Sequence, residues 1–241
     1  HFPKPDVSEQ QSISHILTLI QSAIQKQQQI IRTTTELKNA LMQKLFTEGT
    51  KGEVQKQTEI GLIPESWEVV ELGEVCDLVK NTYEPQTDGN KPYVGLEHII
   101  PGIPKIYSHG YENEVVSSKN QFKAGQIIYG KLRPYLDKAA IPDIDGICST
   151  DILVINGKNR VENIFLINLF HTEKFIAYAK ATTTGVQHPR TSWSSLKKFK
   201  FALADHYERV EIAKILETVY KKIQHHQTKK QTLTALFRSL L

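Results

Sequence analysis

The sequence contains few of the residues on which cross-links, metal sites and membrane insertion depend. Its 241 residues include only two cysteines. Cys76 and Cys148 stand far apart, without the close spacing of a zinc site or the number of partners that a disulfide framework needs. No apolar run approaches the roughly 20 residues that span a bilayer. The sequence therefore predicts a protein of a reducing, cytoplasmic compartment with no membrane partner.

Sequence motifs of catalysis are also missing. The chain has no glycine-rich phosphate loop and no Asn-Pro-Pro-Tyr or Asp-Pro-Pro-Tyr motif of amino-methylating enzymes. Glu36-Leu-Lys38 resembles the end of a nuclease motif, but it lies in a predicted long helix, where a structural use is favoured. We therefore expect a non-catalytic protein that holds no cofactor and no metal of its own.

The charge of the chain is nearly balanced. It has 30 Lys and Arg against 26 Asp and Glu, a net charge of +4 and a pI of about 8.9. This bias is compatible with nucleic acid but is common among proteins that bind none, so composition leaves the partner open. The length allows one or two compact units.

A long amphipathic segment occurs twice, once at each end of the chain. At an offset of 199 residues, the first copy's Phe2, Asp6, Glu9, Ile13, Ile16, Leu17, Ile24 and Gln25 recur as Phe201, Asp205, Glu208, Ile212, Ile215, Leu216, Ile223 and Gln224. Apolar residues at alternating steps of three and four are typical of a coiled-coil seam. We expect conserved coiled-coil helices within 1–49, with Ser8 as the cap, and within 201–241. They should run antiparallel, because one enters and the other leaves the same middle domain.

Each predicted seam contains one polar residue at an equivalent position. The first seam is expected to contain Ile13, Leu17, Ile20, Ile24, Gln27, Ile31, Leu37, Leu41 and Leu45. The second is expected to contain Ile212, Leu216, Val219, Ile223, His226, Leu233, Leu236 or Phe237, and Leu240. Gln27 and His226 either fix the register of the two helices or lie on the edge of the seam without a role, and the pattern leaves both interpretations open.

The helices enclose residues 58–200, which follow a polar linker at 50–57. Short strands are predicted at 93–96, 126–129, 139–141 and 151–155, and helices at 161–170 and 174–181. The predicted fold class is α+β, a globular mixed domain plus two long helices forming an antiparallel coiled coil. Because the second copy of the repeat follows this domain directly, we expect an equivalent domain before the first copy. The sequence would then be a fragment or processed half of a longer protein.

The first candidate contact surface is the stretch 130–138, which we call the basic turn. It presents Lys131, Arg133, Tyr135 and Lys138 after a predicted strand. Lysine and arginine neutralise phosphates, and arginine can also pair with the edge of a guanine. The alternative is an exposed basic loop with a packed tyrosine.

The second candidate stretch, 182–193, is polar and lacks the apolar anchors of a core segment. Its candidate DNA contacts are Thr184, Gln187, His188, Arg190 and Ser192. Hydroxyl, amide and guanidinium groups suit base edges and phosphates, while Trp193 is expected to anchor the loop. Lys80 and Thr82 form a third candidate, with a solvated loop as the alternative.

Together these stretches resemble the DNA-specificity subunits of type I restriction–modification systems. The resemblance covers nearly the whole chain and rests on several sequences in the same order. They include Ile63-Pro-Glu-Ser-Trp-Glu-Val-Val-Glu-Leu-Gly73, Tyr93-Val-Gly-Leu-Glu-His-Ile99, Gly130-Lys-Leu-Arg-Pro-Tyr-Leu-Asp-Lys138, Gly146-Ile-Cys-Ser-Thr-Asp-Ile-Leu-Val154 and Pro189-Arg-Thr-Ser-Trp193.

The resemblance implies a subunit with two target-recognition domains, each reading one half of a bipartite site in double-stranded DNA. Its helices would set the spacing of the half-sites and dock modification subunits, with a restriction subunit joining the complex. It also implies that S-adenosylmethionine, Mg and ATP bind to those partner subunits. One such domain is present here, so a homodimer or a second half is implied for a complete site. The rival hypothesis is a coiled-coil adaptor that binds protein and no DNA.

Overall fold

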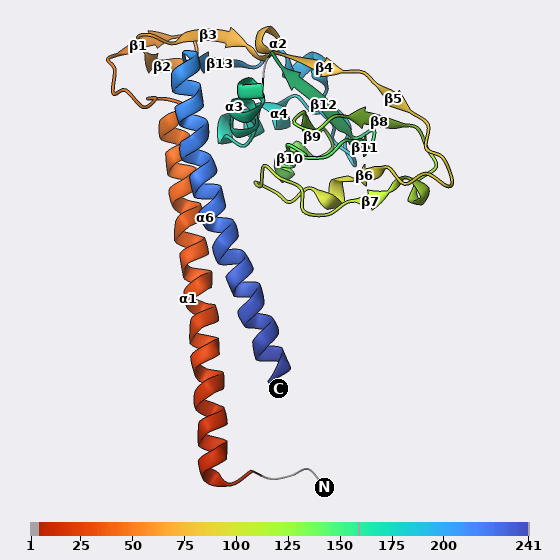
Figure 1. The fold of residues 1–241 in the computed structure, drawn as a ribbon. Helices are drawn as coiled ribbons and strands as arrows, with labels where there is room; N and C mark the ends of the chain where they lie inside the picture. Colours follow the sequence, from red (N-terminus) through yellow and green to blue (C-terminus); the bar gives the residue numbers. More distant parts are fainter. Residues whose placement is uncertain (1–4, 159, 241) are drawn as a thin grey trace. The chain divides into compact units, whose positions relative to one another are not determined.

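The computed structural model describes residues 5–158 and 160–240 (Figure 1). The chain forms two compact units. One, the helix pair, comprises residues 1–41 and 215–241; the other, the α+β body, comprises Met42–Lys214. A mixed α+β domain with two long flanking helices is the fold class that the sequence predicts.

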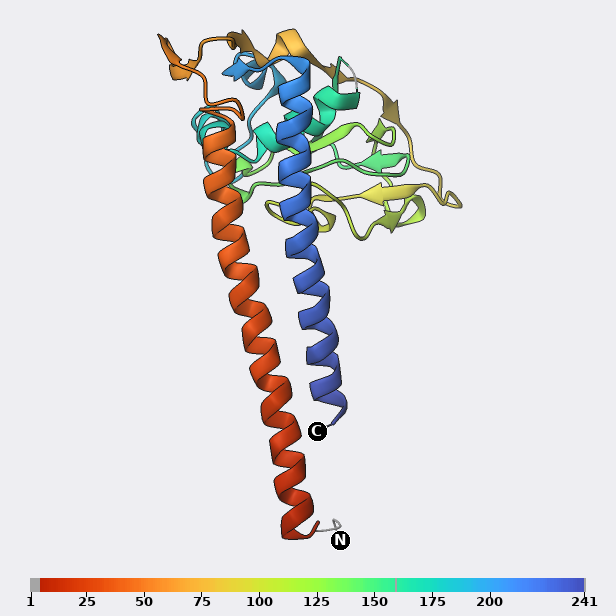
Figure 2. The same ribbon diagram turned by 60° about the vertical axis from the view of Figure 1, so that its left-hand side comes forward.

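The N-terminal and C-terminal parts of the chain each form one long helix. α1 spans Val7–Leu45 and α6 spans His206–Ser239. They pack against each other and run antiparallel, as Figures 1 and 2 show. The contacts confirm the direction: Lys230 donates a hydrogen bond to Gln28 near one end, and the Lys38 ammonium lies 5.2 Å from the ring centroid of Tyr220 farther along.

The two copies of the repeat are capped in the same way. Asp6 accepts a hydrogen bond from the Glu9 backbone N–H at 2.8 Å, and Asp205 accepts one from the Glu208 N–H at 2.9 Å. An aspartate that binds the third backbone N–H is a typical N-cap. The predicted cap Ser8 is therefore wrong, because the helix already begins at Val7.

The seam of α1 differs from the prediction beyond Ile31. Thr34 and Lys38 are each 8% exposed, whereas Leu37 is 53% exposed. A strict alternation of steps of three and four, continued from Ile31, reaches Thr34, Lys38 and Leu41. The sequence prediction placed Leu37 in the seam, whereas helical geometry places Lys38 there. The seam therefore contains more polar residues than the sequence pattern indicates.

The far ends of the helices contribute less to the seam than predicted. Ile13 of α1 is 42% exposed, and Leu236 and Leu240 of α6 are 46% and 48% exposed. Phe237, the alternative to Leu236, is partly buried. The first turns of α1 extend past the end of α6 (Figures 1 and 2).

Gln27 and His226 lie in the interior of the helix pair and contact each other. Gln27 is 8% exposed, and the His226 Nδ1–H donates to its Oε1 at 2.8 Å. The two residues are equivalents in the 199-residue repeat. Their contact therefore marks the point about which the two repeat copies are related by an approximate twofold rotation. This favours the interpretation that the polar pair fixes register.

The α+β body contains four small sheets, antiparallel except where β6 and β11 pair in parallel. The four-stranded sheet has the order β10-β9-β12-β4, with β4 at Cys76–Val79, β9 at Ile127–Gly130, β10 at Ala139–Ala140 and β12 at Ile152–Gly157. The five-stranded sheet has the order β5-β8-β11-β6-β7, with β5 at Thr82–Tyr83, β6 at Pro92–Val94, β7 at Gly110–Tyr111, β8 at Lys119–Phe122 and β11 at Gly146–Cys148. Two further pairs join β1 (Gln55–Thr58) with β2 (Gly61–Pro64) and β3 (Glu68–Glu71) with β13 (Lys200–Leu203).

Short helices connect the strands. The α-helices are α2 (Leu72–Val75), α3 (Arg160–Phe170), α4 (Glu173–Ala181) and α5 (Trp193–Leu196). The 3-10 helices are η1 (Leu96–His98), η2 (Glu112–Glu114) and η3 (Pro134–Leu136). The predicted helices correspond to α3 and α4, and the predicted strands to β6, β9, β10 and β12.

Two segments differ from their predicted structure. β1 begins at Gln55, within the expected linker 50–57. Residues 201–203, expected to open the second helix, lie instead in β13, where Phe201 pairs with Val70 of β3. Phe201 is 4% exposed and its ring lies 6.4 Å from that of Phe165. Burial against another strand therefore overrides the helical repeat at this point.

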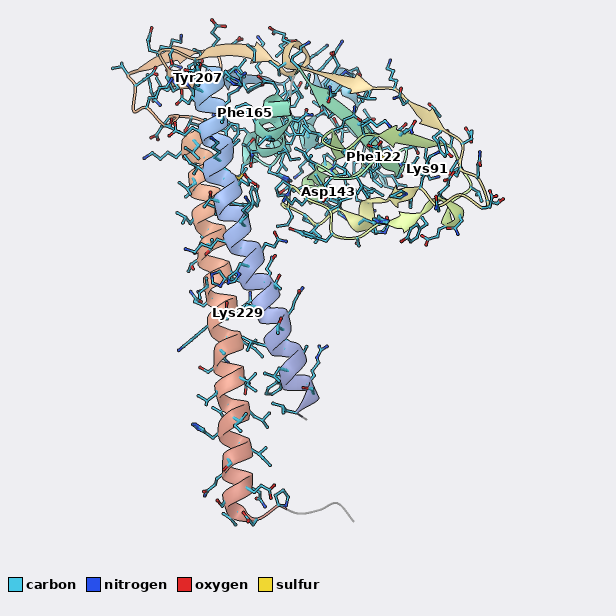
Figure 3. All side chains as sticks on the ribbon, in the orientation of Figure 1. Lys91, Phe122, Asp143, Phe165, Tyr207 and Lys229 are labelled. Atoms are coloured by element: carbon cyan, nitrogen blue, oxygen red, sulfur yellow. The ribbon has the colours of Figure 1, made fainter. Side chains whose placement is uncertain are left out.

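A continuous core joins the two larger sheets of the body. The fully buried cluster contains Val94, Ile99, Phe122, Ile128, Ala140, Cys148, Ile152 and Val154. Figure 3 labels Phe122 inside the body. Cys76 and Cys148 are free and buried, and burial raises the pKa of each thiol to about 12. Neither thiol is therefore poised to react. None of the described helices is long and apolar enough to cross a membrane.

A buried carboxylate joins three segments of the body. The Glu208 side chain is 1% exposed, and it accepts hydrogen bonds from the Trp67 indole at 3.0 Å and the Thr50 backbone N–H at 2.7 Å. The Lys51 ammonium lies 3.3 Å away and neutralises its charge. Gly49 has a φ of +70°, and a Cβ there would lie 2.4 Å from the carboxylate. The loop after α1, the start of β3 and the first turn of α6 therefore meet at one group.

We expect Glu208→Ala to lower the free energy of unfolding by about 3 kcal/mol, because it leaves two buried donors unpaired. Urea unfolding followed by tryptophan fluorescence would measure the loss. The control is Glu217→Ala, since Glu217 pairs with Lys221 on the exposed surface of α6 and its loss should cost at most about 0.5 kcal/mol. Equal losses in both variants would contradict the role assigned to Glu208.

The helix pair should lose stability in mild acid through His226. Burial lowers the pKa of His226, and His225, Lys222 and Lys229 lower it further. The folded-state pKa thus lies below the ordinary value of about 6.5. As the pH falls, the unfolded chain therefore binds more protons than the folded chain. The contribution of His226 is complete above about pH 7 and is lost as the pH falls through the folded-state pKa.

We expect His226→Gln to reduce the difference in urea midpoint between about pH 7.5 and about pH 5. Circular dichroism at the helical minimum is the readout. His15→Gln, on the exposed surface of α1, is the control and should keep the pH dependence of the parent. An unchanged pH dependence in His226→Gln would refute the effect.

Candidate nucleic-acid interface

The two candidate stretches lie side by side in the body, although about fifty residues separate them. Leu132 and Arg190 form an antiparallel bridge. The Arg133 N–H donates to the Pro189 carbonyl at 2.8 Å, and the Thr191 N–H donates to the Lys131 carbonyl at 3.0 Å. The fold therefore builds one surface from both stretches.

The basic turn exposes Arg133, whereas Lys131 and Lys138 are half-buried. It leaves β9 at Gly130 and passes through η3, where Pro134 is buried and Tyr135 is 47% exposed. Arg133 has a φ of 50°, a left-handed conformation that few non-glycine residues adopt. Within residues 5–158 and 160–240, the side chains of Lys131 and Arg133 have no hydrogen-bonding protein partner. Both are therefore available to phosphates.

A buried histidine supports the far side of the basic turn. Asp137 also has a left-handed φ, of 52°, and its carboxylate accepts a hydrogen bond from His171 Nδ1–H at 2.6 Å. The His171 side chain is fully buried, and its other ring nitrogen has no partner. The Asp137–His171 contact ties the turn to the segment between α3 and α4.

Residues 184–190 form a tight loop, which we call the tip loop. Thr184 and Arg190 close its base with two backbone hydrogen bonds of 2.9 Å each. Gly185 has a φ of +88°, which glycine adopts without steric cost. Val186 is 99% exposed, and Gln187 and His188 are also exposed. The loop therefore presents one apolar and two polar side chains at its end.

Arg190 is engaged by a carboxylate. Its Nε and Nη2 donate to the two oxygens of Asp151 at 2.7 and 3.1 Å. The guanidinium lowers the pKa of Asp151, and the carboxylate raises the pKa of Arg190. Asp151 precedes β12, and its carbonyl accepts the Lys131 N–H at 2.9 Å. The sequence interpretation missed Asp151 because no local pattern links it to a partner 39 residues away.

The remaining candidates occupy other settings. The Lys138 ammonium donates to the Leu96 carbonyl at 2.6 Å, and Ser192 caps α5 by accepting the Ser195 N–H at 3.3 Å. Lys80 and Thr82 lie at or beside β5, the edge strand of the five-stranded sheet, and both are exposed. The structure thus brings together the candidates of the basic turn and the tip loop, while Lys80 and Thr82 lie on another sheet.

The positive charge of this surface is local. Residues 42–214 contain 21 Lys and Arg against 22 Asp and Glu, so the basic excess of the chain lies in residues 1–41 and 215–241. At this surface, Lys131 and Arg133 are cations whose side chains form no hydrogen bond within the described part of the chain. Among the described residues, no group of three or more histidine, cysteine or acidic side chains could hold a metal ion.

Comparison with known proteins decides the family. The profile of the type I restriction modification DNA specificity domain matches residues 64–235. This chain belongs to that family. The chain is 29% identical over 167 residues to the EcoDI specificity subunit of Escherichia coli, covering 68% of this chain and 37% of that protein. It is 27% identical to the MjaVIII specificity subunit of Methanocaldococcus jannaschii, covering 96% of this chain and 58% of that protein.

Solved structures share the fold of this specificity domain. The S subunit of a type I restriction–modification system from M. genitalium superposes with a TM-score of 0.63 at 16% identity, covering 98% of this chain and 60% of that one. The HsdS subunit from Thermoanaerobacter tengcongensis superposes with a TM-score of 0.58 at 13% identity, covering 99% and 58%. The chain spans about half the length of the curated relatives that it matches.

The Asp137–His171 contact predicts different effects for two substitutions. Asp137→Ala removes the hydrogen bond and places a Cβ-bearing apolar residue in the left-handed region, so it should lower the free energy of unfolding by about 2 kcal/mol. Asp137→Asn keeps an acceptor and tolerates the conformation, so it should cost less than about 1 kcal/mol. Urea unfolding would compare them, and equal losses would contradict the assigned contact.

Proposed function

We propose that this chain is the DNA-reading and scaffolding part of a type I restriction–modification complex. The basic turn and the tip loop would read one half of a bipartite site in double-stranded DNA. The observation that supports this most directly is their juxtaposition, which places Lys131 and Arg133, whose side chains have no hydrogen-bonding partner among the described residues, beside a loop of exposed polar groups. The chain itself would catalyse nothing; modification subunits would carry S-adenosylmethionine, and a restriction subunit ATP and Mg.

The contacts divide by chemistry. Lys131 and Arg133 would neutralise phosphates, because neither side chain has a hydrogen-bonding partner in the described part of the chain. Gln187 and His188 would meet base edges, since amide and imidazole groups both donate and accept hydrogen bonds. Thr184 and Tyr135, both exposed, would make further contacts from the base of the tip loop and from η3.

The other candidates would act from the edges of this surface. The polar side-chain atoms of Lys138 and Ser192 already have protein partners. These two residues would therefore support DNA binding indirectly, by holding in place the backbone segments that they contact. Lys80 and Thr82 would contact DNA only where the duplex reaches the five-stranded sheet.

The helix pair would dock the modification subunits and set the distance to a second half-site. A second recognition domain, from a homodimer or a second half of the protein, would bind at the start of α1. The repeat supports this, because Asp6 and Glu9 reproduce the cap that Asp205 and Glu208 form, yet the side chains of Asp6 and Glu9 are exposed. We place the complex in the cytoplasm, where its DNA substrate lies.

Selection from a randomised duplex library tests the proposal, with and without the cognate modification subunit and at two salt concentrations. We expect a short defined half-site to be enriched and its affinity to fall with salt. Binding without enrichment would reject sequence recognition. Absence of salt-dependent binding even with the modification subunit would instead indicate a protein-binding adaptor.

Removal of the charge of Lys131 or of Arg133 should weaken DNA binding regardless of sequence. We expect Lys131→Gln and Arg133→Gln each to reduce the slope of log affinity against log salt by about 1. Lys158→Gln is the matched control. This exposed lysine follows the last residue of β12, at the opposite end of the strand from Asp151. Fluorescence anisotropy with the selected duplex is the readout, and equal slopes in all three variants would contradict the assignment.

A further inference from the structure

The contacts of Arg190 separate it from the other cations of the interface. The Nε–Nη2 edge of its guanidinium is occupied by both oxygens of Asp151, and Nη1 donates to the His188 carbonyl at 3.4 Å. Lys131 and Arg133 have no comparable partner in the described part of the chain. The edge with which an arginine best grips a phosphate or a guanine is thus already in use.

The backbone of Arg190 is equally engaged. Its N–H and carbonyl both bond to Thr184, which closes the tip loop, and it bridges to Leu132 of the basic turn. Through its side chain it also reaches Asp151, the residue before β12. One residue therefore connects the tip loop, the basic turn and the four-stranded sheet.

The tip loop depends on few other constraints. Thr182 and Thr191 share a hydrogen bond of 2.9 Å just outside the loop, and Thr191 is buried. Beyond the Thr184–Arg190 pair, the loop is held by the turn at Gly185, by the Arg133 N–H that donates to the Pro189 carbonyl at 2.8 Å, and by the bond to the His188 carbonyl. Arg190 supplies both the closing pair and the bond to the His188 carbonyl, so the orientation of the three exposed side chains depends largely on where Arg190 is held.

We propose that Arg190 is a positioning residue, and that its ion pair with Asp151 holds the tip loop so that Val186, Gln187 and His188 meet the base edges. This rests on the proposed DNA-reading function. Val186 would contact an apolar group in the groove, the methyl group of a thymine, because this is the apolar feature that base pairs present there. Arg190 then contributes to sequence preference without touching DNA.

Charge exchange distinguishes this role from a direct contact. The variants are Asp151→Asn, Arg190→Lys, and the double variant Arg190→Asp with Asp151→Arg. The readout is the ratio of affinities for the selected duplex and a scrambled one. We expect each single variant to lower that ratio about tenfold, with binding to the scrambled duplex changed less than about twofold. The double variant should recover most of the ratio.

The opposite pattern would overturn the proposal. If Arg190 touches DNA, Asp151→Asn frees its charge and should strengthen binding to both duplexes. The double variant would then place an acidic residue against the phosphates and weaken both. Arg190→Lys would keep the preference of the parent if charge alone matters.

Hydrogen exchange in the free chain gives a readout that requires no DNA. The amides of Thr184 and Arg190 should exchange faster in Asp151→Asn and return to the parent rate in the double variant, while far-UV spectra confirm that all variants fold. If the parent enriches no duplex, the proposed function fails, whereas the exchange rates still decide whether the ion pair holds the loop. Parent-like exchange in Asp151→Asn would reject the positioning role.

Discussion

The α+β body depends on one buried carboxylate that serves three distant segments. Glu208 begins a helix, yet its oxygens are occupied by the Trp67 indole and the backbone of Thr50. A buried charge is tolerated only when paired and hydrogen-bonded, and here Lys51 and two donors supply both. The close approach of Gly49 leaves room for no side chain at that position. Glu208 thus fixes both ends of the chain segment that forms the body to Trp67, the residue before β3.

Beside one sheet, the body carries the two stretches proposed to contact DNA. β9 leads into the basic turn, and Asp151, just before the neighbouring strand β12, holds the tip loop. Antiparallel pairing of β9 with β12 therefore brings together residues that the sequence separates widely. The body as a whole has no basic excess, so the proposed DNA recognition would depend on where a few charges lie and on which of them have partners. Arg190 and Arg133 have the same charge, but the guanidinium of Arg190 is paired with Asp151, whereas the Arg133 side chain has no hydrogen-bonding partner among the described residues.

Features that repeat locally could be predicted from the sequence. The coiled-coil spacing located both long helices, and short apolar runs located β9, β12 and α4, because each signal lies within a few neighbouring residues. Features that depend on distant partners could not. Phe201 lies in a strand because Val70 pairs with it, and Lys38 enters the seam because of helical geometry, against its polarity. In the candidate site, composition predicted both stretches, and the fold places them side by side, but the commitment of Arg190 to Asp151 was visible only in the folded chain.

The measurement that tests the DNA-reading surface most directly is photochemical cross-linking to a duplex pool containing 5-iodouracil, with the attached peptides mapped by mass spectrometry. It succeeds whichever bases the surface recognises, because the pool contains every sequence. Cross-links within residues 130–138 and 184–190 are the predicted result. Cross-links confined to α1 and α6, or to the edge strand β5, would place the DNA elsewhere and contradict the assignment.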